Sequence, residues 1–264
     1  MRGSAVAVLR KCVLPQLPIP LIRPQFFLRS AQGAGTFSLW EKEKGATVWE
    51  TAMAIRDHTA EEICRHGRSI FERGLTFGSS GNISARVPGG WLMTPTGVAL
   101  DRLDPARLSR LDDSGRHIGG DAPTKESFLH LAMYGERPRA NAIVHLHSTH
   151  SVAVSCLDGV NTEDVLPPVT AYYIMRVGTL PLVPYYAPGD QELAEAVRRQ
   201  AGKHHAVLLA NHGPVVAGTS LEAAVGAIEE LEETARIYLM LRGEKTRWLT
   251  EAQVKEIRAR FPAG

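Results

Sequence analysis

The chain has 264 residues, of which 44% are hydrophobic and 22% are charged, with 30 Lys and Arg against 28 Asp and Glu. This hydrophobic fraction supplies a sizeable buried core and excludes a globally disordered protein. A formal net charge of +2 is too small for a protein whose affinity rests on neutralising phosphates, so no nucleic-acid partner is expected.

The sequence contains no segment typical of a membrane-spanning helix. Its most extended apolar stretch, residues 12–28, is interrupted by four prolines and an arginine, which excludes a spanning helix there. The three cysteines, Cys12, Cys64 and Cys156, form neither an even framework nor a Cys-x-x-Cys pair. This usage suits a reducing compartment, so we expect a cytoplasmic protein with no membrane partner.

Residues 1–47 are expected to be an N-terminal extension, and residues 48–264 a single folded domain. The first forty residues contain five basic residues and no Asp or Glu, a composition that resembles a mitochondrial transit peptide. No Ser-rich amphipathic helix accompanies it. Two other interpretations compete with targeting: the segment is a disordered extension, or it is translated sequence upstream of a true start at Met53.

The folded part begins with a helical pattern from about Trp49, where apolar residues recur at three- and four-residue steps until Gly74 supplies a C-cap. A turn cluster at 78–82 follows. Residues 83–87 and 91–94 then predict a hairpin around the Pro-Gly-Gly turn at 88–90.

Helices and strands alternate in the rest of the chain. We expect a helix that opens near 123–126, a strand over 142–147 and a helix from Thr149 towards Cys156. Apolar strands are predicted at 180–184 and 207–210, and a long amphipathic helix from Leu221 to Leu239. Alternation of this kind indicates an α/β domain with a mixed sheet covered by helices.

Three histidines are the main candidates for a metal site. His145 and His147 are two residues apart at the end of an apolar strand, so both imidazoles point to the same face. His212 follows another apolar strand, and the Gly-Pro after it predicts a turn that places it at a strand tip. Three imidazoles with a position open to substrate are typical of catalytic zinc. The alternative is a set of histidines that only cap helices or bond to backbone.

Glu126 is the candidate acid/base, because it opens a helix, where negative charge is favoured. The alternative is a solvated carboxylate in the first turn. Its neighbour Lys125 suits an anion-binding group better than a Schiff-base nucleophile. Three small-residue segments, at 80–82, 94–97 and 124–125, could cradle a phosphate or be ordinary turns.

Taken in order, these motifs resemble the class II aldolase family, which includes fuculose-phosphate aldolase and ribulose-phosphate 4-epimerase. The matching segments are Gly81-Asn82-Ile83-Ser84, Thr94-Pro95-Thr96-Gly97, Thr124-Lys125-Glu126, His145-Leu146-His147-Ser148-Thr149-His150 and Asn211-His212-Gly213. The resemblance covers about Glu61 to Leu241 and is greatest to the branch that decarboxylates 3-oxo-tetronate 4-phosphate. Thr124-Lys125 supports that branch, because the aldolases usually carry two small hydroxyl residues there.

The resemblance implies the fold and the roles of individual residues. It implies a single domain with a central mixed, mostly antiparallel sheet, in homotetramers with sites between subunits. The implied metal ligands are Glu126, His145, His147 and His212, with Zn2+ as the ion and Mn2+ or Co2+ as alternatives; Glu126 also shuttles a proton. The implied phosphate contacts are Gly81, Asn82, Thr96, Gly97, Thr124 and Lys125. Tyr172, or the adjacent Tyr173, is the implied proton donor to a neighbouring subunit.

The implied reaction is metal-dependent loss of CO2 from a phosphorylated sugar acid, 3-oxo-tetronate 4-phosphate, through a metal-stabilised enediolate, with dihydroxyacetone phosphate as the second product. A sugar-phosphate aldolase of the fuculose 1-phosphate type, or a 4-epimerase, is the alternative, because aldol cleavage passes through the same enediolate. A non-catalytic interaction module of the adducin type is a third possibility. The four filled ligand positions argue against it.

Overall fold

A computed structural model describes residues 39–187 and 189–261, with side chains from Val48 onward. The predicted extension over residues 1–47 lies outside the described residues, apart from the backbone at the start of helix α1 (Leu39–Glu72). That helix begins earlier than the predicted start near Trp49, because Glu-Lys-Glu-Lys at 41–44 is a run of good helix formers. Glu43–Gly264 forms one compact unit.

An eight-stranded sheet lies at the centre of this unit, in the order β4-β3-β2-β1-β5-β8-β7-β6. Every pairing is antiparallel except that of β6 with β7. The prediction of a mixed, mostly antiparallel sheet is therefore confirmed. The strands are β1 (Asn82–Val87), β2 (Gly90–Met93), β3 (Ser109–Asp112), β4 (His117–Gly119), β5 (Ala142–His145), β6 (Leu182–Val183), β7 (Ala206–Leu209) and β8 (Gly213–Gly218).

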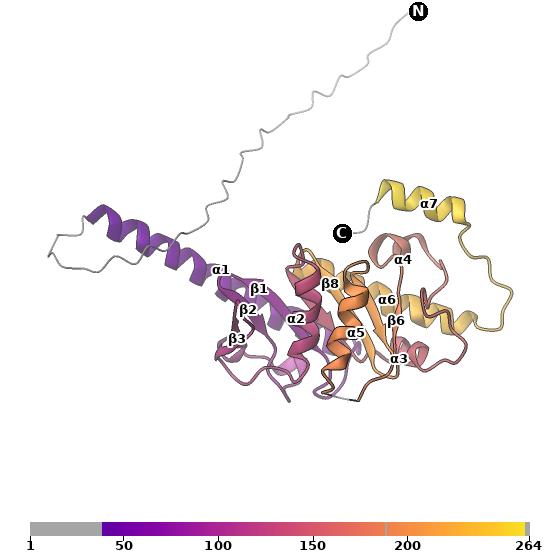
Figure 1. Cartoon of the computed structure of the whole chain (residues 1–264), viewed down its shortest axis with the longest axis horizontal. Coiled ribbons are helices and arrows are strands. Elements are labelled where there is room, and N and C mark those ends of the chain that lie inside the picture. Colours follow the sequence, from indigo (N-terminus) through magenta and orange to yellow (C-terminus); the bar gives the residue numbers. More distant parts are fainter. Residues whose placement is uncertain (1–38, 188, 262–264) are drawn as a thin grey trace, which may run out of the picture. The chain divides into compact units, whose positions relative to one another are not determined.

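Helices cover both faces of the sheet. On one face α2 (Ser127–Glu136) and α5 (Glu192–Ala201) pack side by side (Figure 1). The core on the other face contains side chains of α1, α3 (Thr149–Ser155), α4 (Ala171–Arg176) and α6 (Leu221–Leu241). The last helix, α7 (Glu251–Arg260), packs against α4. Among the described residues, no helix combines the length and apolar character needed to cross a membrane.

Strand alternation decides which side chains meet α2. On β5, Ala142 and Val144 point into the core shared with α6, whereas Ile143 points into the core shared with α2. His145 is two residues beyond Ile143, so it belongs to the α2 face. On β1, the buried Asn82 and Ser84 face the same way, since Ile83 and Ala85 belong to the other core.

The predicted hairpin is present as β1 and β2, with Val87 paired to Gly90. One expectation was wrong: Gly213-Pro214 does not form a turn but begins β8. The turn precedes it, at Asn211, whose φ of 55° is left-handed. Gly213 itself has a φ of 155°, and a Cβ there would collide with the carbonyl oxygen of Leu146. Glycine is therefore needed where β8 approaches the end of β5.

Candidate metal centre

Four side chains from three parts of the chain converge on the α2 side of the sheet. Glu126 is the N-cap residue of α2, His145 ends β5, and His147 follows two residues later. His212 lies in the turn between β7 and β8. One potential ligand atom from each of these four residues lies within 4.8 Å of the others. The structure thus brings together all four residues that the sequence proposed as ligands.

The imidazole Nε2 atoms form the centre of this cluster. Nε2 of His147 is 3.1 Å from Nε2 of His145 and 3.1 Å from Nε2 of His212. The Glu126 carboxylate joins the cluster, with one oxygen 3.0 Å from Nε2 of His212 and the other 3.5 Å from Nε2 of His145. Nitrogens bound to one tetrahedral zinc are separated by about 3.3 Å, so these spacings fit a shared ion.

The tautomer of His145 also fits a metal ligand. Its Nδ1 lies 2.8 Å from the carbonyl oxygen of Pro214. A carbonyl only accepts, so Nδ1 carries a proton, and Nε2 is the nitrogen of His145 that would bind a metal. A backbone carbonyl that holds the distal nitrogen of a ligating histidine is a common arrangement in metal sites. Three imidazoles and one carboxylate are a donor set that suits a divalent ion such as zinc.

Burial and charge act in opposite directions on the ionisation of these groups. Burial raises the pKa of the Glu126 carboxyl, but the charge of His145 and the neighbouring hydrogen bonds outweigh it and hold that pKa well below its usual range. Burial, together with the charges of His145 and His212, lowers the pKa of His147 to about 4. Glu126 is therefore a carboxylate and His147 a neutral imidazole at neutral pH, the forms in which each can bind a metal.

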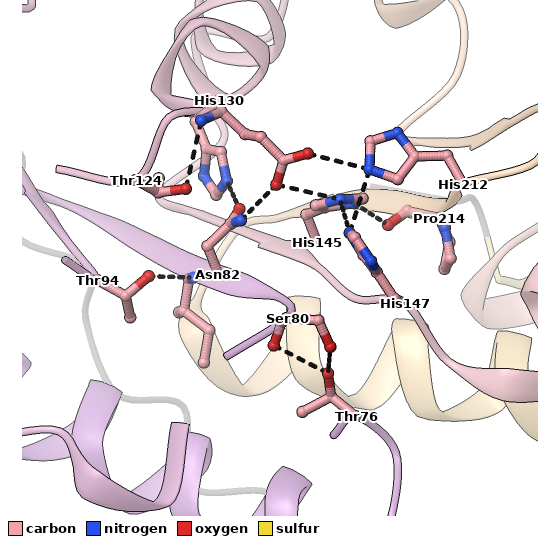
Figure 2. A network of polar contacts seen from close by, with 12 residues as sticks. Thr76, Ser80, Asn82, Thr94, Thr124, His130, His145, His147, His212 and Pro214 are labelled. Carbon is pink, nitrogen blue, oxygen red and sulfur yellow. Dashed lines mark hydrogen bonds and ion pairs between the residues drawn. The ribbon is translucent and has the colours of Figure 1, made fainter. Parts of the chain in front are cut away.

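The Glu126 carboxylate has a further neighbour in Asn82. Nδ2 of Asn82 donates to Glu126 Oε2 over 2.7 Å. On its other side, Oδ1 of Asn82 accepts from Nε2 of His130 over 2.5 Å (Figure 2). His130 is fully buried on α2, and this burial lowers its pKa to about 3. Asn82 was expected to contact phosphate, whereas His130 was not singled out from the sequence, although its position four residues after Glu126 gave a usable signal.

The predicted phosphate segments lie next to one another. The backbone N–H of Thr124 donates to the carbonyl of Thr94, and that of Thr96 donates to the carbonyl of Ala122. The Thr94 hydroxyl accepts from the backbone N–H of Ile83, which follows Gly81-Asn82. Thr96, Gly97 and Lys125 are exposed, whereas Thr124 is buried. Thr96, Gly97 and Lys125 are therefore accessible to an anion.

The two candidate tyrosines differ sharply in exposure. Tyr172 is 60% exposed on α4, with the Arg176 guanidinium 6.0 Å from its ring centre. Tyr173 is fully buried, and among the described residues its hydroxyl has no hydrogen-bond partner. Burial raises the pKa of Tyr173 well above its usual value. A proton donor to a second subunit must reach the surface, which Tyr172 does and Tyr173 does not.

A large cavity in the described part of the chain lies elsewhere. It has a volume of about 1050 Å3 and lies between α1, the end of α2 and the start of α6. Its lining includes Arg65, Arg73, Arg137, Arg139 and Arg176, and none of the four clustered donors. Three imidazoles and a carboxylate that converge on one point indicate metal binding more directly than the volume of a cavity indicates a site. The cluster is therefore the candidate site.

Comparison with known proteins identifies relatives over most of the chain. The sequence profile of the Class II Aldolase and Adducin N-terminal domain matches residues 61–239. A 3-oxo-tetronate 4-phosphate decarboxylase from Escherichia coli is 48% identical over 206 residues, which cover 78% of this chain and 97% of that protein. An L-fuculose phosphate aldolase from the same organism is 34% identical over 186 residues, covering 70% and 84% respectively.

Solved structures give the same grouping. The crystal structure of YgbL from Escherichia coli, described as an aldolase/epimerase/decarboxylase, superposes with a TM-score of 0.76 and 46% identity. The match covers 77% of this chain and 99% of YgbL. An L-fuculose 1-phosphate aldolase superposes with a TM-score of 0.67 and 26% identity, over 76% of this chain and 95% of that one.

Proposed function

Because the chain belongs to the class II aldolase family, we propose that it is a metal-dependent carbon–carbon lyase that decarboxylates 3-oxo-tetronate 4-phosphate. The observation that carries this proposal is the 48% identity, over nearly the whole of the relative, to a protein named for that reaction. The identity to the fuculose-phosphate aldolase is 34%. The four-donor cluster supports the requirement for a metal, since its nitrogens and carboxylate are arranged as a ligand set.

The reaction breaks the bond between the carboxylate carbon and C2 of the substrate. CO2 leaves, and the bonding electron pair is delocalised from C2 onto the oxygen of the neighbouring ketone. The product of this step is an enediolate. One proton added to C2 then gives dihydroxyacetone phosphate. A divalent ion held by Glu126, His145, His147 and His212 supplies Lewis acidity to the substrate oxygens; zinc suits these donors, and Mn2+ and Co2+ are alternatives.

Glu126 and Tyr172 are the proposed proton-transfer residues. Glu126 is ionised, and Asn82 fixes one of its oxygens at 2.7 Å. It would accept the proton of the C2 hydroxyl as CO2 leaves and return it to that oxygen when C2 is protonated, so that the net uptake is one proton. Tyr172, exposed on α4, is proposed to deliver the proton to carbon in the site of a neighbouring subunit. This assignment requires a homo-oligomer, which we propose to be a tetramer with sites between subunits.

The phosphate is proposed to bind at Gly81, Asn82, Thr96, Gly97, Thr124 and Lys125. Backbone N–H groups at glycines and the Lys125 ammonium suit a phosphate dianion. Anchoring this remote group orients the bond that breaks and lowers the entropic cost of reaching the transition state. We assign these roles to residues 48–264, with residues 1–47 as an extension. A cytoplasmic location is proposed, because the free Cys64 and Cys156 suit a reducing compartment.

Product analysis tests the proposed function. The substrate would be generated in situ by a kinase, and CO2 and dihydroxyacetone phosphate measured together, with and without a chelator. An enzyme-free control is essential because β-keto acids lose CO2 spontaneously. Chelator-sensitive CO2 release above the control is expected. Cleavage of fuculose 1-phosphate without accelerated CO2 release would instead favour the aldolase alternative.

A further inference from the structure

A continuous chain of hydrogen bonds leads from Glu126 into the buried face between α2 and the sheet. After Asn82 and His130, it continues from Nδ1 of His130 to the Ser84 hydroxyl over 2.7 Å. The Ser84 hydroxyl is in turn 3.0 Å from the hydroxyl of Tyr134. His130 and Ser84 are completely buried and Tyr134 is 3% exposed, so bulk water does not replace any of these contacts.

The direction of every bond in this chain follows from its Glu126 end. At one end the Glu126 carboxylate can only accept, so Asn82 must present its NH2 group to it. Asn82 then presents its carbonyl oxygen to His130, which must carry its proton on Nε2. The unprotonated Nδ1 of His130 accepts from the Ser84 hydroxyl, and the Ser84 oxygen accepts from Tyr134. The Tyr134 hydroxyl is therefore the donor at the far end of the chain of bonds.

Within this hydrogen-bond network, His130 alone could exchange its donor and acceptor atoms by moving one proton between Nε2 and Nδ1. With the proton on Nδ1, Nε2 would accept from the Asn82 NH2 group. The Asn82 carbonyl would then face the Glu126 carboxylate, and two acceptors would oppose each other at hydrogen-bond distance. The Glu126 carboxylate disfavours this tautomer, and the Ser84 hydroxyl accommodates the favoured one by donating to Nδ1. The orientation of Glu126 therefore depends on the tautomer of a residue that is neither a proposed metal ligand nor a proposed phosphate contact.

We propose that His130 is a positioning residue of the metal centre: its Nε2-protonated tautomer orients the Asn82 amide, and the Asn82 amide holds the Glu126 carboxylate in its ligating position. This proposal rests on the proposed function of the four-donor cluster as a metal site. Groups that orient metal ligands in this way typically change metal affinity or activity by about 10- to 100-fold when they are removed.

Three variants and a matched control test the proposal. His130→Phe fills the site without a donor, His130→Gln retains both a donor and an acceptor, and Ser84→Ala removes the group that directs a donor at Nδ1. The control is His205→Phe, since His205 is also mostly buried with both ring nitrogens near backbone carbonyls, those of Ala217 and Val177. The zinc dissociation constant is measured by competition with a chromophoric chelator, alongside kcat and KM.

His130→Phe should raise the zinc dissociation constant and lower kcat by about 10- to 100-fold, with a much smaller change in KM. His130→Gln should recover a large part of both losses, and Ser84→Ala should change both in the same direction as His130→Phe. Zinc affinity and kcat in His130→Phe and Ser84→Ala that match the control would overturn the proposal. If His130→Phe does not fold, the zinc affinity and kcat of the smaller substitution Ser84→Ala decide whether the proposal holds.

Nitrogen-15 spectra of the histidine-labelled, metal-free protein check the tautomer directly. The ring signals lost in His130→Gln should be those of a neutral imidazole protonated on Nε2, and a ring protonated on Nδ1 would refute the inference. The zinc and nitrogen-15 measurements need no substrate. Wild-type protein that binds zinc without decarboxylating would therefore refute the proposed reaction and still test His130, whereas failure to bind zinc, Mn2+ and Co2+ alike would refute both proposals.

Discussion

Replacing Glu232 with alanine should destabilise the fold by about 2–6 kcal/mol. Glu232 is a buried residue of α6 whose carboxylate lies at the N-terminus of α3. It accepts from the backbone N–H and hydroxyl of Ser151 at 2.9 and 2.7 Å, and from the backbone N–H and Nδ1 of His150 at 2.9 and 2.8 Å. A carboxylate in this position also interacts favourably with the helix dipole.

The size of the effect follows from which donors lose their partner. Ser151 is completely buried, so its N–H and O–H would remain unsatisfied, at a cost of about 1–3 kcal/mol each. The His150 side chain is 38% exposed, so water can replace its two bonds at little cost. The adjacent Glu233 provides the control, since it pairs with Arg236 on an exposed surface. Glu233→Ala should cost at most about 1 kcal/mol.

Urea denaturation of the metal-free variants, followed by circular dichroism, measures both free energies of unfolding. Loss of about 4 kcal/mol corresponds to a decrease in Tm of roughly 8–16 °C for a domain of this size. Glu232→Gln should fall between wild type and alanine, because it keeps one acceptor oxygen. A Glu232→Ala variant within 1 kcal/mol of Glu233→Ala, a margin comparable to one ordinary hydrogen bond, would show that α3 does not depend on this carboxylate.

Three further predictions concern the site. His147→Ala should lose bound metal and activity together, whereas His150→Ala, in the same segment but outside the cluster, should keep metal at the wild-type ratio. Elemental analysis measures the metal content of both variants, and metal retained by His147→Ala would remove His147 from the ligand set. Glu126→Gln should keep the fold and most phosphate affinity while kcat falls by about 10²- to 10⁴-fold, as steady-state kinetics and inorganic phosphate binding would show; near wild-type turnover would assign the acid/base role elsewhere. Tyr172→Phe should lower kcat with little effect on KM. Tyr173→Phe should leave kcat unchanged, because the Tyr173 hydroxyl is buried and lacks a partner among the described residues. The opposite result would assign the proton donor to Tyr173.

The parts of the fold that the sequence predicted are those with strong local signals. The hairpin of β1 and β2 surrounds a Pro-Gly-Gly turn, and α6 has an apolar face that extends from Leu221 to Ala235. Strands β3, β4 and β8 lack such signals. Three of the four residues of Ser109–Asp112 are polar, and β8 begins with Gly213-Pro214, a pair typical of turns. The Pro214 carbonyl bonds to His145, so a tertiary contact outweighs its local preference.

The candidate site was predictable for a different reason. Four residues of types that bind metals follow strands or begin a helix, and their order resembles that of a known family. The network behind them was not predicted, because Ser84 and His130 are 46 residues apart and meet only when β1 and α2 pack together. A helical periodicity argument would have placed His130 on the same face as Glu126, four residues earlier. It would not have identified Asn82 as the link between them.

The two outermost strands of the sheet have a consequence for the behaviour of the protein at high concentration. β4 has three residues and β6 has two, and these strands form the open edges of an otherwise continuous sheet. An exposed edge is a template for pairing with another molecule, and very short edge strands offer too few free backbone groups to start such pairing. The edge strand β6 also lies between Pro181 and Pro184, which have no N–H to donate, so the longer and almost fully buried central strands are kept from edge-to-edge aggregation.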